Sequence, residues 1–312
     1  MYLLGFDIGG TKCAVSTARC EGSSLEILEK RKCPTEKISP YKMIEKLISM
    51  ADSILESKPD KIGISCGGPL DSKKGLILSP PNLLGWDNIE IVKTIQEHYN
   101  VPVFLQNDAN ACAVAEWKFG AGVGKNNLVF LTFGTGLGAG IILDGKLYSG
   151  TNDNAGEVGH IRLDNYGPVG FGKTGSFEGF CSGGGIAQLG KIKALEKKQM
   201  GEVPMYCNGE EITAKSIAEA ADKGDKTALE VFEISGRYLG KGLSIIIDIL
   251  NPEMIIIGSV FARSKHLLLN SALKEIERES LASSAKCCKI VPAKLGERIG
   301  DYAALSVATI GG

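Results

Sequence analysis

Residues 3–16 read Leu-Leu-Gly-Phe-Asp-Ile-Gly-Gly-Thr-Lys-Cys-Ala-Val-Ser, and this stretch determines how we interpret the rest of the chain. Two apolar runs flank a short glycine turn, a pattern typical of a β-hairpin. The glycines let the backbone approach a ligand closely, while Thr11 and Lys12 add a hydroxyl and a positive charge at the tip. Asp7 ends the first strand and faces whatever the tip binds. The stretch suits phosphate and its metal ion, although in isolation a plain glycine turn also explains it.

A second stretch repeats this design. Residues 128–143 form an apolar run that ends in Gly134-Thr135-Gly136, turns, and continues as another apolar run. The two hairpins lie about 125 residues apart, and their recurrence indicates an internal duplication with one phosphate loop in each half. The repeat favours phosphate binding over a plain turn for the first hairpin.

Composition limits the class of protein. The chain has 312 residues, enough for two domains, with 44% hydrophobic and 23% charged residues, as in soluble globular proteins. A formal net charge of −1 argues against nucleic acid as the main partner. The sequence runs directly into a strand and has no long apolar segment, so we expect a cytoplasmic protein without signal peptide or membrane contact. The nine cysteines form no Cys-x-x-Cys pair and are expected to be reduced.

Strands and helices are expected to alternate along the chain, which indicates an α/β fold. Expected strands lie within 2–33 and at 61–65, 101–105, 128–143, 254–259 and 289–291. Expected helices lie at 41–56, 89–98, 111–119, 265–280 and 301–309, and within 213–250, with a break near 223–225.

Two glycine motifs are misleading. Residues 167–174 match the G-x-x-x-x-G-K-[ST] pattern, but a phosphate-binding P-loop needs a helix that begins at the lysine. We expect no long helix here, because glycines stand at 179 and 183–185. Residues 134–140 lack G-x-G-x-x-G spacing and lead into a strand, so they do not predict a dinucleotide fold.

Asp108 is the best candidate for a catalytic residue. It follows the expected strand 101–105 and is flanked by Asn107 and Asn110. A carboxylate there can accept a proton from an alcohol that attacks phosphorus. The alternative is that Asp108 only caps the next helix.

Three further polar residues, Glu157, His160 and Glu178, follow or precede glycine-rich turns. Glu157 and His160 are three residues apart and can hydrogen-bond vicinal hydroxyls at one site. A structural role for His160 remains an alternative, and Glu178 is similarly ambiguous.

Four motifs carry a family resemblance: residues 7–12 (Asp-Ile-Gly-Gly-Thr-Lys), 107–111 (Asn-Asp-Ala-Asn-Ala), 134–138 (Gly-Thr-Gly-Leu-Gly) and 155–160 (Ala-Gly-Glu-Val-Gly-His). With these four motifs in this order, the chain resembles the ROK family of sugar kinases and sugar-responsive repressors. The resemblance implies a duplicated actin-like (ribonuclease H-like) two-domain α/β fold with an interdomain active-site cleft. We expect a small domain at 1–112, joined by a C-terminal helix at about 300–312, and a large domain at 113–299.

The resemblance also implies roles for individual residues. Asp108 would be the general base. The sugar would be bound by Gly68, Asn107, Glu157, His160 and Glu178. The ATP phosphates would be bound by Asp7, Gly9, Gly10, Thr11, Lys12, Gly134, Thr135 and Gly136. Asp7 would reach Mg²⁺ through water, and Gly258 would lie near the adenosine.

The chain departs from the family pattern in one loop. Many members carry a zinc motif, C-x-C-G-x-x-G-C-x-E, whereas Val169, Phe171 and Ser176 stand here at the cysteine positions. One histidine without thiolates cannot form a tetrahedral structural zinc site, so we expect no zinc and His160 available for the sugar. The P-loop lookalike is then what remains of this loop. Ser259 replaces a usual second glycine, and residues 66–71 keep only part of the family's Pro-Gly-Pro-x-Asp.

These observations lead us to expect an ATP-dependent, glucokinase-like kinase that phosphorylates a hexose or an N-acetylhexosamine, with the 6-hydroxyl as acceptor. One alternative is a non-catalytic sugar-sensing ROK protein, and another is a kinase of the same fold that acts on a non-sugar polyol. A DNA-binding repressor is disfavoured because Asp7 lies too near the N-terminus for a preceding helix-turn-helix. The family suggests a homodimer. The sequence does not specify the sugar.

Overall fold

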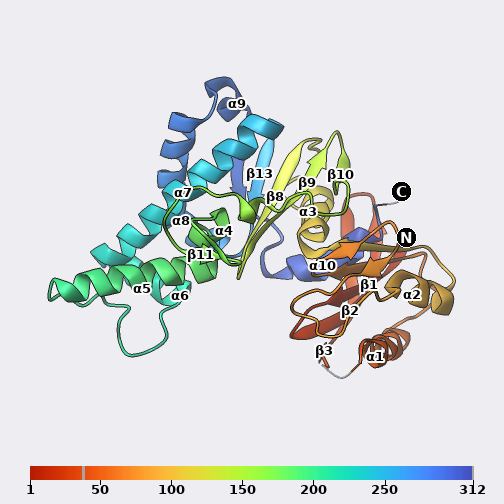
Figure 1. Cartoon of the computed structure of the whole chain (residues 1–312). Coiled ribbons are helices and arrows are strands. Elements are labelled where there is room, and N and C mark those ends of the chain that lie inside the picture. Colours follow the sequence, from red (N-terminus) through yellow and green to blue (C-terminus); the bar gives the residue numbers. More distant parts are fainter. Residues whose placement is uncertain (37–38, 311–312) are drawn as a thin grey trace. The chain divides into compact units, whose positions relative to one another are not determined.

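The computed structural model describes residues 1–36 and 39–310, and it divides the chain into two compact units (Figure 1). Unit 1 comprises residues 1–126, 140–155 and 294–312, and unit 2 comprises residues 127–139 and 156–293. The division therefore differs from the expected boundary at residue 112. The part of the expected C-terminal helix at 311–312 lies outside the described residues.

Unit 1 is built on a five-stranded sheet with the order β3-β2-β1-β4-β7. Its strands are β1 (Tyr2–Ile8), β2 (Lys12–Glu21), β3 (Ser24–Pro34), β4 (Lys61–Cys66) and β7 (Val103–Asn107). β1, β2 and β3 form the predicted antiparallel meander, and β4 and β7 extend the sheet in parallel with β1. The short strands β5 (Leu70–Asp71) and β6 (Leu76–Ile77) pair separately.

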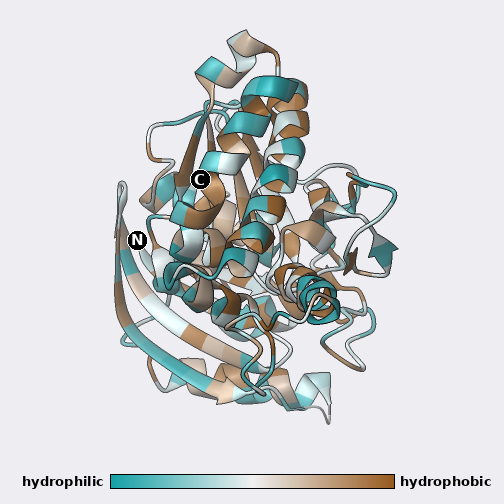
Figure 2. Cartoon of the chain, turned by 90° about the vertical axis from the view of Figure 1, so that its left-hand side faces the viewer, coloured by the Kyte–Doolittle hydropathy of each residue, from teal (hydrophilic) through white to brown (hydrophobic). Residues whose placement is uncertain are grey.

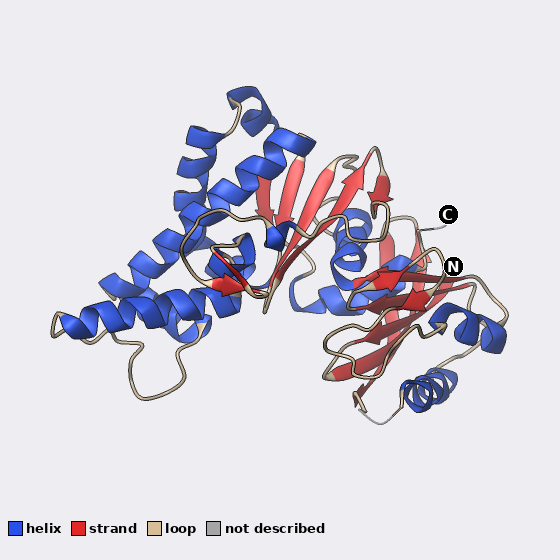
Figure 3. Ribbon diagram, in the orientation of Figure 1, coloured by secondary structure: helices blue, strands red, loops and turns tan. Residues whose placement is uncertain are grey.

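Unit 2 repeats this plan in a second sheet with the order β10-β9-β8-β13-β14. Its strands are β8 (Leu128–Phe133), β9 (Leu137–Leu143), β10 (Lys146–Tyr148), β13 (Met254–Ile257) and β14 (Lys289–Pro292). In this sheet β9 continues into unit 1 and β10 lies wholly in unit 1, yet the order is again a meander of three consecutive strands followed by two parallel strands. The duplication inferred from the two glycine hairpins is confirmed by this repeated strand order. Figure 3 shows the strands of both sheets in red.

The two faces of the first sheet have separate cores, because side chains alternate along each strand. Leu4, Phe6 and Ile8 face α1 (Pro40–Asp52) and α2 (Ile91–Tyr99). Leu3 faces the opposite side, where it packs with α3 (Asp108–Phe119) and α10 (Ile299–Val307). Gly63 of β4 allows α10 to approach closely, since a Cβ there would lie 2.0 Å from the Ala304 carbonyl oxygen. Asp7 therefore belongs to the face covered by α10.

Unit 2 carries most of the helices: α4 (Phe177–Phe180), α5 (Gly183–Gln199), α6 (Ala214–Asp222), α7 (Lys226–Leu250), α8 (Ser259–Glu279) and α9 (Ala282–Cys287). Short elements complete the chain: the 3₁₀ turns Val158–His160 and Gly296–Arg298 and the hairpin β11 (Val169–Gly170) and β12 (Lys173–Thr174).

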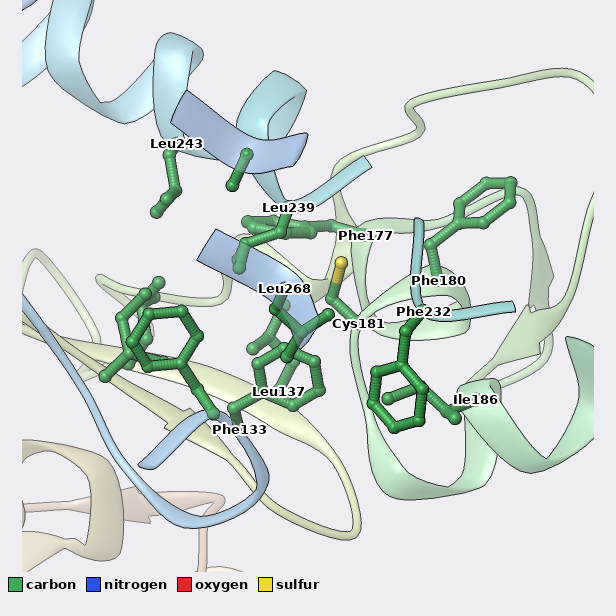
Figure 4. Packing of buried hydrophobic residues seen from close by; sticks show 14 of the residues in the cluster. Phe133, Leu137, Phe177, Phe180, Cys181, Ile186, Phe232, Leu239, Leu243 and Leu268 are labelled. Atoms are coloured by element: carbon green, nitrogen blue, oxygen red, sulfur yellow. The ribbon is translucent and has the colours of Figure 1, made fainter. Parts of the chain in front are cut away.

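The core of unit 2 joins its sheet to these helices. Figure 4 shows Phe133 and Leu137 of the second hairpin packed near Phe177, Phe232 and Leu268 from three helices. Each of these side chains is at most 4% exposed. The long helices alternate hydrophobic and hydrophilic residues along their surfaces, as expected for helices packed on one side (Figure 2). Among the described residues, no helix is both long enough and apolar enough to cross a bilayer.

Most expected elements are present, but three predictions need correction. The strand expected at 254–259 ends at Ile257, and α8 begins at Ser259 rather than near residue 265. The first helix ends at Asp52 rather than near residue 56. The prediction of no long helix at 183–185 is wrong: α5 begins at Gly183 and runs for 17 residues. Ser182 caps it by accepting a hydrogen bond from the Gly185 N–H (3.0 Å), which stabilises a glycine-rich first turn. The nine cysteines are all unbridged, as expected.

Candidate functional site

The carboxyl ends of three parallel strands in unit 1 lie in register. Ile8 of β1 pairs with Cys66 of β4, which pairs with Asn107 of β7. The residues that follow these strand ends therefore lie along one edge of the sheet: the Gly9 turn, the Gly67-Gly68 loop and Asp108. The carboxyl edge of an α/β sheet is where such folds bind their ligands. The structure thus brings the unit 1 residues predicted from the sequence to one edge.

The first hairpin has a tight tip. The Gly9 N–H donates to the Lys12 carbonyl (3.2 Å), and the Thr35 hydroxyl donates to the Gly9 carbonyl (2.5 Å). Thr11 and Lys12 are exposed. Gly10 packs against the Asn82 segment so closely that a Cβ would lie 2.6 Å from the Asn82 carbonyl oxygen. The tip therefore offers an exposed hydroxyl and an exposed ammonium group on a fixed backbone.

Asp7 lies below this tip and is half-buried. Burial raises its pKa to about 6, the Lys30 ammonium opposes that rise, and the nearby Asp108 carboxylate adds to it. Lys30 itself forms an ion pair with Asp301 at the start of α10. Desolvation and the neighbouring Lys32 lower the pKa of Lys30 to about 8. Asp7 is thus a desolvated carboxylate beside a second carboxylate, an arrangement that a bound cation would stabilise.

Asp108 is not the cap of its helix. The capping residue of α3 is Asn107, whose side-chain oxygen accepts a hydrogen bond from the Asn110 N–H (2.8 Å). Asp108 is the first helical residue, and one of its oxygens accepts from the Ala109 N–H (2.8 Å). The residue is solvent-accessible, yet surrounding protein raises the pKa of its carboxyl by desolvation. Solvent accessibility and a raised pKa occur together when a side chain is open to solvent on one side and enclosed by protein on the others.

The second hairpin, in unit 2, meets the start of α5. The Gly134 N–H donates to the Gly136 carbonyl (3.0 Å), and the Gly183 N–H donates to the Gly134 carbonyl (2.8 Å). Gly258 precedes α8, and its N–H donates to the Leu131 carbonyl of β8 (3.0 Å). The positive ends of two helix dipoles therefore lie near Gly134, where they favour an anion.

A cavity of about 790 Å³ opens beside this hairpin within unit 2. The N-termini of three helices line it, at Gly183 of α5, Thr213 before α6 and Ser259 of α8. Lys191, Lys215 and Arg263 add positive charge, while Glu211, Glu219 and Asp222 add negative charge. Its size is in the range of cavities that hold drug-sized ligands and cofactors.

The lining of this cavity includes the predicted residues Gly134 and Thr135, whereas its residues from α5, α6 and α8 are not among the predicted site residues. The Ser182 cap followed by glycines was a usable signal for the start of α5, but we read those glycines as helix breakers.

Glu178 of α4 contacts the second hairpin directly. Its Oε2 accepts a hydrogen bond from the Leu137 N–H (3.0 Å). A Cβ on Gly136 would lie 2.8 Å from that oxygen, and one on Gly159 would lie 3.3 Å from the Glu178 Cβ. Glu178 is therefore next to both the hairpin and the short turn that carries Glu157 and His160, whose side chains are exposed. The unit 2 residues predicted to bind sugar or phosphate lie together.

Residues 169–176 form a hairpin and a helix cap. The Phe171 and His160 rings form a T-shaped pair with centroids 5.2 Å apart, and Lys173 donates to the His160 carbonyl (2.5 Å). Ser176 caps α4 by accepting from the Gly179 N–H (3.1 Å). Lys173 and Thr174 belong to β12 and begin no helix, so the P-loop interpretation is excluded. In residues 1–36 and 39–310, no three His, Cys, Asp or Glu side chains are placed to hold a metal ion.

Residues 3–309 match the model of the ROK family. The chain belongs to the ROK family. A glucokinase from Halalkalibacterium halodurans is 33% identical over 308 residues, covering 96% of this chain and 92% of that protein. Together with the repeated sheets, the match assigns the chain to the duplicated actin-like α/β fold.

Two solved ROK structures, a glucokinase and a transcriptional regulator, are similar to this chain. A glucokinase from Streptomyces griseus, solved with glucose and AMPPNP, is 29% identical with a TM-score of 0.77, over 99% of both chains. A ROK family transcriptional regulator, a homologue of the E. coli MLC protein, is 28% identical with a TM-score of 0.87; the match covers 99% of this chain and 78% of that one. Our ROK chain is thus similar to sugar kinases and to regulators.

Proposed function

We propose that this protein is an ATP-dependent sugar kinase that phosphorylates a hexose or an N-acetylhexosamine at the 6-hydroxyl. The observation that carries the proposal is Asp108: its carboxylate is accessible, is not the helix cap, and lies at the same sheet edge as a glycine hairpin suited to phosphate. The similarity to glucokinases supports the same activity.

In the proposed mechanism Asp108 accepts the proton of the sugar hydroxyl as that oxygen attacks the γ-phosphorus of ATP in line; the bond from this phosphorus to the β–γ bridging oxygen breaks and ADP leaves. Asn107, Gly68, Glu157, His160 and Glu178 bind the sugar. Gly9–Lys12 and Gly134–Gly136 bind phosphate oxygens, and the cavity of unit 2 near Gly258 takes the adenosine.

Mg²⁺ fits the carboxylate chemistry of Asp7, whose charge is poorly solvated in the protein alone. When bound, Mg²⁺ would neutralise charge on the phosphates. Asp7 would hold it through water and so orient the nucleotide toward Asp108.

The test is ADP release measured with glucose, fructose, allose, N-acetylglucosamine and N-acetylmannosamine, and with a non-sugar polyol. We expect turnover with at least one sugar. Asp108→Asn should lower kcat by about 10²–10⁴-fold, the usual contribution of a general base. Glu45→Gln, a change of an exposed carboxylate on α1, is the matched control and should leave kcat unchanged. Near-normal kcat in a folded Asp108→Asn protein would refute the assignment of the base.

The similarity to a ROK regulator supports a second candidate, a sugar-sensing protein without catalysis. Sugar binding without ADP release from ATP under any of these conditions would favour it. We further propose that the protein is a homodimer; light scattering would measure its mass.

A further inference from the structure

The loop from Ser149 to Ala155 is closed and carries a buried acid. The Ala155 N–H donates to the Ser149 carbonyl (3.1 Å), which fixes the ends of the loop. Asp153 lies within it, in a left-handed conformation (φ 61°), and is only 6% exposed. A carboxylate is rarely buried this far unless the protein supplies hydrogen-bond donors.

Ser72 supplies two of these donors. Its backbone N–H donates to one Asp153 oxygen (2.8 Å) and its hydroxyl to the other (2.7 Å). Hydrogen bonds to a carboxylate are stronger than those between neutral groups. Ser72 follows the segment from Gly68 to Asp71, which contains the proposed sugar contact Gly68. Asp153 therefore fixes the end of that segment to the 149–155 loop.

The backbone of Asp153 reaches a second part of the proposed sugar site. Its carbonyl accepts a long hydrogen bond from the Asn107 side-chain nitrogen (3.4 Å). The other end of the Asn107 amide accepts from the Asn110 N–H (2.8 Å). Both ends of this amide are thus engaged, which fixes its plane directly before Asp108.

We propose that Asp153 is a positioning residue that orders the sugar-binding surface of unit 1. It ties the Gly68–Ser72 segment and the Asn107 side chain to one loop, and that loop continues along the chain into Glu157. The inference rests on the proposed sugar kinase function and deepens it. Asp153 touches no reacting atom in this scheme; it acts through Ser72 and Asn107.

Asp225 provides a matched control for a purely structural role. It is also a buried acid, 8% exposed, and it accepts two backbone hydrogen bonds, from Ala228 (2.8 Å) and Met205 (2.6 Å). It caps α7 and belongs to no proposed site. Asp225→Ala should therefore lower the melting temperature and leave both KM values unchanged.

The experiment compares steady-state kinetics and melting temperature for Asp153→Ala, Asp153→Asn, Ser72→Ala and the Asp153→Ala/Ser72→Ala double variant. Asp153→Ala should raise the KM for sugar by about tenfold or more, consistent with loss of two charge-assisted bonds, while the KM for ATP stays within about twofold. An asparagine at 153 keeps an oxygen that can accept from the Ser72 N–H, and its amide nitrogen can donate to the Ser72 hydroxyl. Asparagine also tolerates a positive φ, so Asp153→Asn should recover most of the sugar affinity. Ser72→Ala should have a smaller effect, and the double variant should be no worse than Asp153→Ala, because both changes break one link.

An unchanged KM for sugar in Asp153→Ala, with a lower melting temperature as in Asp225→Ala, would show that the residue is only structural. If Asp153→Ala does not fold, the comparison of Ser72→Ala and Asp153→Asn with the wild type decides the question. Absence of kinase activity in the wild type would instead refute the proposed function. Sugar binding measured by calorimetry on the same variants would then still test the positioning role.

Discussion

Burial of the Asp7 carboxylate lowers the stability of the folded protein when the carboxylate is charged. Its folded pKa of about 6 exceeds the ordinary value of 3.8, so between these values the folded protein binds more protons than the unfolded chain. Stability therefore falls as pH rises through this window, and above about pH 6 the buried charge is destabilising. A carboxylate retained at such a cost is typical of a functional position.

Asp7→Asn should accordingly raise the melting temperature at pH 8, measured without nucleotide or metal, and lose kinase activity. The gain in stability should disappear near pH 4, where Asp7 is neutral as well. Asp60→Asn is the control for removal of a carboxylate that is not buried, because the Asp60 carboxylate is exposed where it accepts a hydrogen bond from the Tyr2 N–H. A variant no more stable than wild type at pH 8 would contradict the desolvation of Asp7.

Single site residues could be predicted from the sequence where a suitable residue type stands at the end of a strand. Asp108 was selected because it follows a strand, but whether it caps the helix could not be read from its neighbours. That choice depends on the backbone at Asn107, which is extended (φ −69°, ψ 161°) and therefore takes the capping position. Asp153 was not singled out, because its partner Ser72 lies 81 residues earlier in the chain.

Among the elements, the start of α5 shows how packing decides the role of adjacent glycines. A Cβ on Gly185 would lie 1.9 Å from the Gly179 carbonyl oxygen, whereas one on Gly184 would have only ordinary contacts, 3.8 Å from the Thr135 carbonyl oxygen. Propensity treats the two glycines alike, so no sequence rule separates them.

Gly185→Ala should destabilise the protein by about 1–3 kcal/mol, because α5 must move away from α4. Gly184→Ala, one residue earlier in the same turn, should be neutral or slightly stabilising, since alanine favours the helix. Urea unfolding of both variants measures the difference. Equal midpoints would mean that the α4–α5 contact is looser than described.

The 169–176 segment is the element at which the sequence predicts no zinc site, because Val169, Phe171 and Ser176 offer no thiolate. It makes a T-shaped ring contact from Phe171 to His160, a hydrogen bond from Lys173 to the His160 carbonyl, and the Ser176 cap of α4. We expect elemental analysis to find no stoichiometric zinc and EDTA, in the absence of Mg²⁺ and nucleotide, to leave the melting temperature unchanged. One zinc per chain, or a large loss of stability on chelation, would overturn this prediction.

For the whole molecule, the repeated hairpin was enough to predict an internal duplication, because each copy carries its own glycine turn between apolar strands. The actin-like fold itself was predicted from the resemblance to the ROK family. The boundaries of the two units were harder to predict from the sequence. Residues 140–155 belong to unit 1 although the strand that leads into them starts in unit 2, and only tertiary packing reveals such an exchange.

Unit 1 also depends on a distant part of the chain. Leu305 of α10 packs with Leu3 of β1, and Gly63 leaves no room for a side chain under Ala304. Gly63→Ala should therefore reduce stability by about 1–3 kcal/mol or prevent folding. Gly67→Ala, four residues later and with no atom within 4 Å of the added Cβ, should keep the wild-type midpoint in the same urea titration. A Gly63→Ala protein as stable as wild type would show that α10 does not pack as described.

The return of α10 to the first sheet has a consequence for synthesis on the ribosome. The strands β1 to β4 emerge early, but α10, one of the two helices that cover their Leu3 face, is translated after all of unit 2. The Leu3 face of the nascent N-terminal sheet must therefore wait with only α3 to cover it, while unit 2 can complete its own core first. During translation this protein is thus expected to finish folding its second unit before its first.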